Sequence, residues 1–91
     1  MSWHLLFPER YLIAERRFLR RHPELRERYA KTLLLLEQDP SHPALRLHPL
    51  KGRLTGLHSV SINLKYRITL VLEIREEEIL LVDVGTHDEV Y

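Results

Sequence analysis

The spacing of hydrophobic residues in this 91-residue chain changes from helical to alternating near its middle. Residues 3–7 form a short apolar segment that ends at Pro8, which predicts a strand followed by the first turn of a helix. Apolar residues then recur every three or four positions over 9–21 and again over 23–38, where Pro23 opens the second run. The first half therefore predicts one strand and two antiparallel helices.

The second half carries β patterns. Leucines and basic residues interleave over 44–56, which we interpret as an ordered basic loop. Apolar and polar residues alternate over 57–63 and 66–74, and 79–84 is almost continuously apolar before Gly85. Because an all-apolar strand is covered on both faces, we expect 79–84 to lie centrally in the sheet. The predicted fold is α+β in the order β-α-α-β-β-β, with a mostly antiparallel sheet and two helices on one face.

The alternation limits how the strands 57–63 and 66–74 pair. A three-residue loop over 64–66 pairs Ile62 with Ile68, and we favour it, although a five-residue loop keeps the same parity. In either register the polar residues of both strands share one face of the sheet. These residues are Ser59, Ser61, Asn63, Arg67 and Thr69.

Groups suited to phosphodiester chemistry converge in this arrangement. A tight turn at Glu76-Glu77 places Arg67 opposite Thr86, so that His87 follows beside the guanidinium. A guanidinium stabilises charge on phosphoryl oxygens, an imidazole exchanges protons near neutral pH, and a phenol stacks on a base. The candidate residues are His48, Arg67, His87 and Tyr91.

Each of these residues also has an ordinary structural interpretation. Arg67 could be a surface group paired with Glu73 or Glu89, and His48 could brace the loop before Pro49. His87 could be an exposed residue of an acidic tail. The arginines of the first helix are expected to form a solvated face; they are Arg16, Arg17, Arg20 and Arg21.

Composition removes several classes of protein. The length fits a single domain over residues 1–91. The chain has no cysteine, which excludes disulfides, thiolate zinc sites and cysteine nucleophiles. No apolar run is long enough to span a membrane and no secretory signal pattern is present, so we expect a cytoplasmic protein. The six histidines are scattered without ligand spacing, so we expect no metal site and no cofactor.

The net charge of +1 conceals an uneven distribution. Residues 39–72 hold five lysines and arginines against one acid, whereas residues 73–91 hold one arginine against seven acids. The basic stretch contains most of the candidate site, which is the distribution expected of a surface that binds nucleic acid.

The second half also resembles a known family. The resemblance rests on the order of four motifs, and it covers about half of the chain. They are His48-Pro49-Leu50-Lys51-Gly52, Leu54-x-Gly56, Tyr66-Arg67-Ile68, and the final Val84-Gly85-Thr86-His87-Asp88-Glu89-Val90-Tyr91. In this order they resemble the RelE/ParE superfamily of bacterial toxins, closest to its YafQ-like and plasmid-stabilisation branch.

The resemblance implies an mRNA interferase, a metal-independent endoribonuclease that acts on mRNA at the ribosome and is neutralised by a cognate antitoxin. By resemblance, Arg67 stabilises the phosphate, His87 protonates the leaving oxygen and Tyr91 orients the substrate. YafQ-like proteins carry a further histidine and an aspartate where Ser61 and Lys65 stand here, so we assign the general base to His48. The expected RNA-binding residues are Lys51, Arg53, Ser61, Asn63 and Lys65.

A second function remains open at this stage. ParE-like members of the superfamily inhibit DNA gyrase without cutting RNA, and a degenerate toxin could keep only antitoxin binding. ParE-like chains generally lack the ending that His87 and Tyr91 form here, which favours the ribonuclease.

Overall fold

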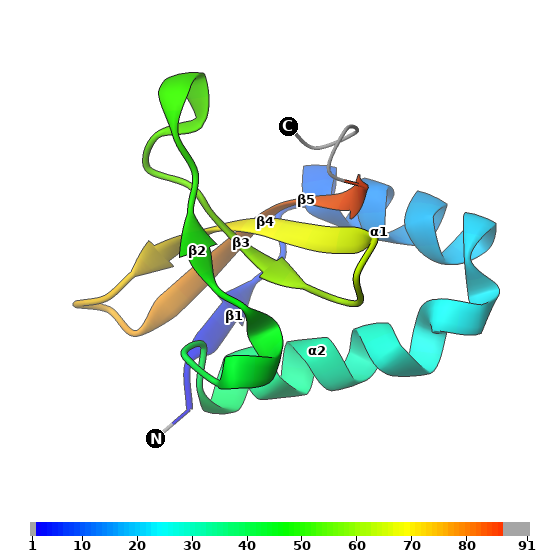
Figure 1. The fold of residues 1–91 in the computed structure, drawn as a ribbon, viewed down its shortest axis with the longest axis horizontal. Coiled ribbons are helices and arrows are strands. Elements are labelled where there is room, and N and C mark those ends of the chain that lie inside the picture. The colour runs from blue at the N-terminus through cyan, green and yellow to red at the C-terminus, as the bar shows by residue number, and fades with distance from the viewer. Residues whose placement is uncertain (1, 87–91) are drawn as a thin grey trace.

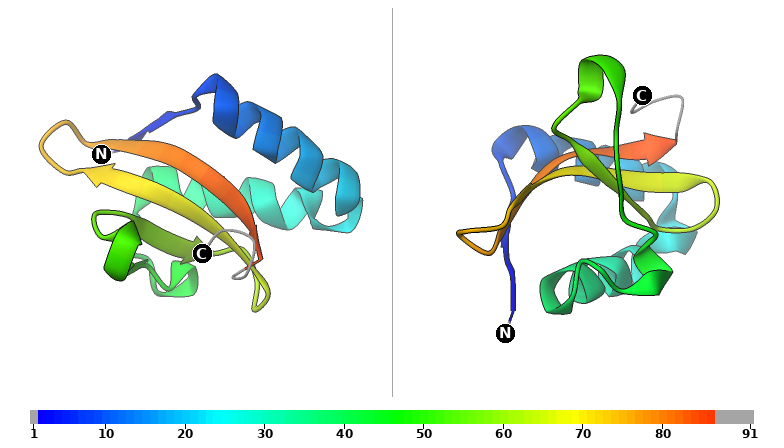
Figure 2. Two further views of the ribbon diagram at one scale, coloured as in Figure 1. Left: turned by 90° about the horizontal axis from the view of Figure 1, so that it is seen from above. Right: turned by 60° about the vertical axis from the view of Figure 1, so that its left-hand side comes forward.

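The computed structural model describes residues 2–86 as a curved five-stranded sheet with two helices on one side (Figures 1 and 2). Strand order in the sheet is β1-β5-β4-β3-β2, and every pair is antiparallel except β1 with β5. The α+β class, the mostly antiparallel sheet and the helix packing are confirmed. The main elements are β1 (His4–Leu6), α1 (Glu9–Arg21), α2 (Arg26–Gln38), β2 (His48–Pro49), β3 (His58–Ser61), β4 (Tyr66–Glu73) and β5 (Glu78–Thr86).

The two helices follow the sequence signals closely. The carbonyl of Pro8 accepts the N–H of Leu12, and α1 ends where Pro23 prevents the helical ladder from continuing. The second helix differs at its start, because Pro23–Leu25 form a 3₁₀ turn before α2 begins at Arg26. Most of the predicted apolar stripe faces the sheet, but Leu12 is exposed.

A buried chain of hydroxyls joins the two helices. The hydroxyl of Tyr29 donates to Oε2 of Glu15 at 2.7 Å, so the hydroxyl of Tyr11 donates to Tyr29 at 2.7 Å. Burial, with the Glu15 carboxylate nearby, holds the pKa of both tyrosines far above the ordinary value of about 10. Both phenols therefore stay protonated in the folded state at pH values where an unfolded tyrosine ionises.

We expect this pair to make the protein sensitive to alkali. Because the folded state keeps two protons that the unfolded state loses, the contribution of this pair to the free energy of unfolding should be constant well below pH 10 and fall above it. The expected slope is about 2.7 kcal/mol per pH unit for two tyrosines. Urea unfolding of the wild type and of the Tyr11→Phe/Tyr29→Phe variant, followed from about pH 9 to 11, measures this slope. An equal slope in both proteins would contradict the assignment.

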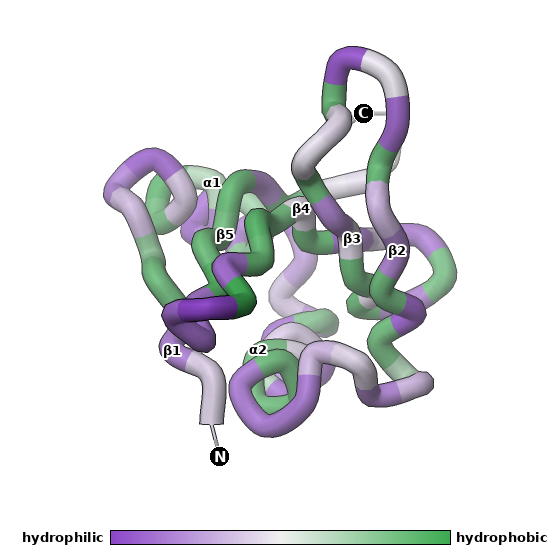
Figure 3. Tube along the Cα trace, turned by 90° about the vertical axis from the view of Figure 1, so that its left-hand side faces the viewer, coloured by the Kyte–Doolittle hydropathy of each residue, from purple (hydrophilic) through white to green (hydrophobic). Residues whose placement is uncertain are grey.

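The loop predicted over 44–56 contains a strand that the pattern did not reveal. β2 is only two residues long, and it exists because His48 and Pro49 pair with Ser59 and His58. A strand this short has no periodicity to detect, so the predicted four-stranded order was one strand short. Between β2 and β3 the chain projects away from the sheet, and its tip carries hydrophilic residues (Figures 1 and 3).

The favoured register of the β3–β4 hairpin was wrong by two residues. Val60 lies opposite Ile68 and Ser61 lies opposite Arg67, which is the five-residue alternative of the same parity. The cause is Asn63, whose side-chain oxygen accepts the N–H groups of Lys65 (2.9 Å) and Tyr66 (2.8 Å) and so closes a wider turn. Because parity is unchanged, the shared polar face survives the shift.

The pairing of the last two strands was also misplaced. Arg67 lies opposite Gly85, not Thr86, because the turn is longer than two residues and a β-bulge interrupts the ladder between Thr69 and Leu70. β5 continues to Thr86 instead of ending at Gly85. It is an interior strand as expected, although the middle position of the five belongs to β4.

Candidate active site

Cross-strand pairing brings the candidate His48 into one row with two polar residues, on the sheet face that points away from the helices. His48 on β2 lies directly opposite Ser59 on β3, and Ser59 lies opposite Thr69 on β4. Directly opposed residues share a face, so all three side chains lie on the same side as Arg67. His48 and Arg67 therefore lie on either side of β3, on strands roughly 10 Å apart.

Arg67 is held in place by a buried serine. Its Nη1 donates to Oγ of Ser59 at 3.0 Å, and Ser59 is fully buried. Within residues 2–86 the guanidinium has no carboxylate at ion-pair distance, so the pairing with Glu73 that the sequence allowed does not form. One donor is anchored, and the rest of the half-buried guanidinium is available for a phosphate.

His48 has a defined tautomer. Its Nδ1 lies 3.2 Å from the carbonyl oxygen of Arg46, and a carbonyl oxygen can only accept. Nδ1 therefore carries the hydrogen in the neutral ring, and Nε2 keeps a free lone pair. A ring fixed in this way can take a proton through Nε2, so the brace that the sequence suggested as an alternative role is compatible with catalysis.

Thr69 adds an unusual feature to the same face. Its side chain is 2% exposed, and its Oγ1 has no hydrogen-bond partner in the described part of the chain. It lies in the same row as Ser59.

Ser59 is the residue of this site that the sequence did not single out. The alternation placed it on the polar face without a role, and the structure shows that it anchors Arg67.

The predicted RNA-binding residues divide into two groups at opposite ends of β3. Lys51 and Arg53 are exposed on the projecting loop before β3, and Lys65 is exposed in the turn after it, 5.5 Å from the centroid of the Tyr66 ring. Ser61 and Asn63 build the turn, since the Ser61 hydroxyl donates to the Asn63 carbonyl at 3.1 Å. The cations thus flank the row of His48 and Ser59 instead of crowding around Arg67.

The described residues leave two candidate residues unplaced and contain no cluster of metal ligands. His87 and Tyr91 lie outside the described residues. Within residues 2–86, no three His, Asp or Glu side chains gather closely enough to hold a metal ion. No helix in the same range is long and apolar enough to cross a membrane. The arginines of α1 are exposed, as expected of a solvated face.

Comparison with known proteins finds similarity in structure only. No protein-family model matches the chain, and no curated protein matches its sequence. Among solved structures, YafQ in the DinJ–YafQ toxin–antitoxin complex of E. coli superimposes with a TM-score of 0.79 at 15% identity. That match covers 100% of this chain and 99% of YafQ.

Two further structures extend the comparison beyond YafQ. A copper-bound mutant toxin from Helicobacter pylori gives a TM-score of 0.75 at 18% identity and covers all of both chains. The toxin–antitoxin complex RelBE2 from Mycobacterium tuberculosis gives 0.64 at 14% identity, with 96% of this chain and 100% of that one covered. Together with the strand order and helix packing, these matches show that the chain has the fold of the RelE/ParE toxin superfamily.

Proposed function

We propose that the protein is the toxin of a type II toxin–antitoxin system and acts as a metal-independent endoribonuclease on mRNA. The observation that carries the proposal is that His48 on β2 and Arg67 on β4 lie on one face of the sheet, both beside Ser59 on β3, which pairs with His48 and accepts a hydrogen bond from Arg67. His48 can accept a proton, Arg67 is an anchored cation on the same face, and basic residues lie at both ends of β3. The full-length structural match to toxins supports the same class.

In the proposed reaction a 2′-hydroxyl of the RNA attacks the adjacent phosphorus. Nε2 of His48 takes the hydroxyl proton, and the guanidinium of Arg67 stabilises the charge that develops on the phosphoryl oxygens. The bond from phosphorus to the 5′-oxygen breaks, and His87 supplies a proton to that oxygen. The products are a 2′,3′-cyclic phosphate and a free 5′-hydroxyl, and Tyr91 orients the substrate by stacking.

The proposed partners follow from this activity. The substrate is mRNA on the ribosome in the cytoplasm, approached by Lys51, Arg53 and Lys65. A cognate antitoxin is proposed because two of the matched toxins were solved in complexes named as toxin–antitoxin pairs. It would silence the toxin by covering its basic surface.

The chemistry can be tested on the wild-type protein. With translating ribosomes, we expect mRNA to be cut into fragments that end in 2′,3′-cyclic phosphate. A single 2′-deoxynucleotide at the cut position should stop cleavage there, because it removes the attacking oxygen. Cleavage that continues at the deoxynucleotide would exclude this mechanism. Inhibited DNA supercoiling with intact mRNA would favour the gyrase-inhibitor alternative instead.

A further inference from the structure

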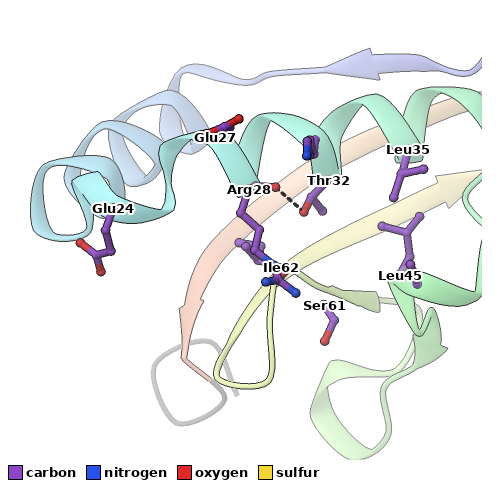
Figure 4. Close-up of a pocket in the computed structure, with 10 residues that line it drawn as sticks. Glu24, Glu27, Arg28, Thr32, Leu35, Leu45, Ser61 and Ile62 are labelled. Atoms are coloured by element: carbon purple, nitrogen blue, oxygen red, sulfur yellow. Dashed lines mark hydrogen bonds between the residues drawn. The ribbon is translucent and has the colours of Figure 1, made fainter.

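Two adjacent cavities lie between α2 and the end of β3, beside the candidate site, and Figure 4 shows the larger one. One has a volume of about 490 Å³ and the other about 380 Å³. They share Arg28, Ala44, Ser61 and Ile62 in their walls, so we treat them together as the Arg28 groove.

Arg28 is anchored in a way that presents its guanidinium to this groove. Its Nε donates to the carbonyl oxygen of Ile62 at 2.9 Å, and Ile62 is buried. The anchor uses one of five donors, which leaves the two terminal nitrogens for a ligand. No carboxylate within residues 2–86 lies at ion-pair distance from Arg28. An anchored guanidinium fork is the preferred partner of a phosphate or carboxylate.

The other walls of the groove separate into a cationic part and an apolar part. Lys31 and Arg46 add positive charge near Arg28. Two acids, Glu24 and Glu27, also line the larger cavity. Glu27 points to the other side of α2 from Arg28, and Glu24 lies before the start of α2, with its Oε2 3.7 Å from Nδ1 of His22 (Figure 4). Leu35 and Leu45 form an apolar wall farther along the helix. A cation beside an apolar wall suits a nucleotide, with the phosphate on the guanidinium and the base in apolar contact with the leucines.

The groove continues directly from the candidate site. Ser61 lines both cavities and lies opposite Arg67, and it follows Ser59 by two residues, about 7 Å along the strand. That step is comparable with the distance between neighbouring nucleotides in an extended chain. Arg46, in the second cavity, is also the residue whose carbonyl orients His48.

We propose that the Arg28 groove is a second RNA subsite that binds the phosphate and base of a nucleotide next to the one that is cut. This inference rests on the proposed ribonuclease function. The same anchored guanidinium could accept the carboxylate of an acidic peptide, and the experiment below separates the two ligands.

The test measures binding of a single-stranded RNA that carries a 2′-deoxynucleotide at the cut position, so that it binds without being cleaved. Arg28→Gln and Arg46→Gln should each weaken binding about tenfold at low salt. Each should also reduce the slope of log affinity against log salt by about 0.7. Arg26→Gln is the matched control, because Arg26 is exposed on α2 and does not line the groove.

Replacing one charged phosphodiester of the RNA by a neutral linkage then identifies which phosphate Arg28 contacts. A methylphosphonate placed in turn at each position flanking the cut should, at one position, weaken wild-type binding about tenfold and leave Arg28→Gln unaffected. Wild-type RNA affinity in both groove variants, or loss of antitoxin binding alone, would overturn the subsite. A wild-type protein that neither binds nor cuts RNA would overturn the proposed function itself, so the two failures are distinguishable.

Discussion

Replacing Arg67 by alanine should slow RNA cleavage by about 100- to 1000-fold while changing RNA affinity far less. The guanidinium is held by Ser59 on the same face as His48. In the proposed mechanism it faces phosphoryl oxygens whose negative charge increases as the phosphorus is attacked. An interaction that strengthens in the transition state lowers kcat more than it raises KM. Single-turnover cleavage with saturating protein measures the effect.

Two comparisons make this prediction specific to the anchored guanidinium. Arg75 is exposed in the turn between β4 and β5, so Arg75→Ala removes the same charge from the chain without touching the site and should cut RNA normally. Arg67→Lys keeps the charge but loses the planar fork, and should recover only part of the rate. Normal cleavage by Arg67→Ala would remove Arg67 from the mechanism.

Replacing His48 by glutamine should lower the rate of cleavage by about 100- to 10,000-fold, the range expected when a general base is lost. The carbonyl of Arg46 leaves Nε2 as the basic nitrogen of the neutral ring, and glutamine has no group that can take a proton in its place. The pH–rate profile of the variant should lose the decline on the acidic side that the base produces. This change in profile distinguishes catalysis from a purely structural brace.

The control for His48 comes from the far edge of the sheet. His4 is exposed on β1, whereas His48 lies on β2 at the opposite edge, so His4→Gln should keep both the rate and the pH profile. A His48→Gln variant with an unchanged acidic limb would reassign the general base.

Several features of the site were predictable because side-chain parity is a local property. Alternation over β3 and β4 places Ser59, Ser61, Arg67 and Thr69 on one face, and a register error of two residues leaves that face intact. The resemblance in the second half also anticipated the toxin fold that the solved structures share. The roles implied for His87 and Tyr91 stay predictions, since both lie outside the described residues.

Other features depended on contacts between distant segments. The strand β2 exists only through its pairing with β3, so His48 appeared in the sequence as a loop residue. The two registers of the β3–β4 hairpin satisfy the same alternation, and the side chain of Asn63 decides between them by closing the turn. The Arg28 groove depends on a hydrogen bond between residues more than thirty positions apart, so no local sequence pattern predicts it.

The sequence by itself determined the class of the fold, the two faces of the sheet and the candidates His48 and Arg67. Hydrophobic periodicity and side-chain chemistry are local properties, so they can be read without knowing which segments are in contact. Only the tertiary structure decided which groups meet. It pairs His48 with Ser59 across two strands, and it forms the hydrogen bonds from Arg67 to Ser59 and from Arg28 to Ile62. Such contacts depend on strand register and on the packing of α2 against the sheet, and both are set by non-local interactions.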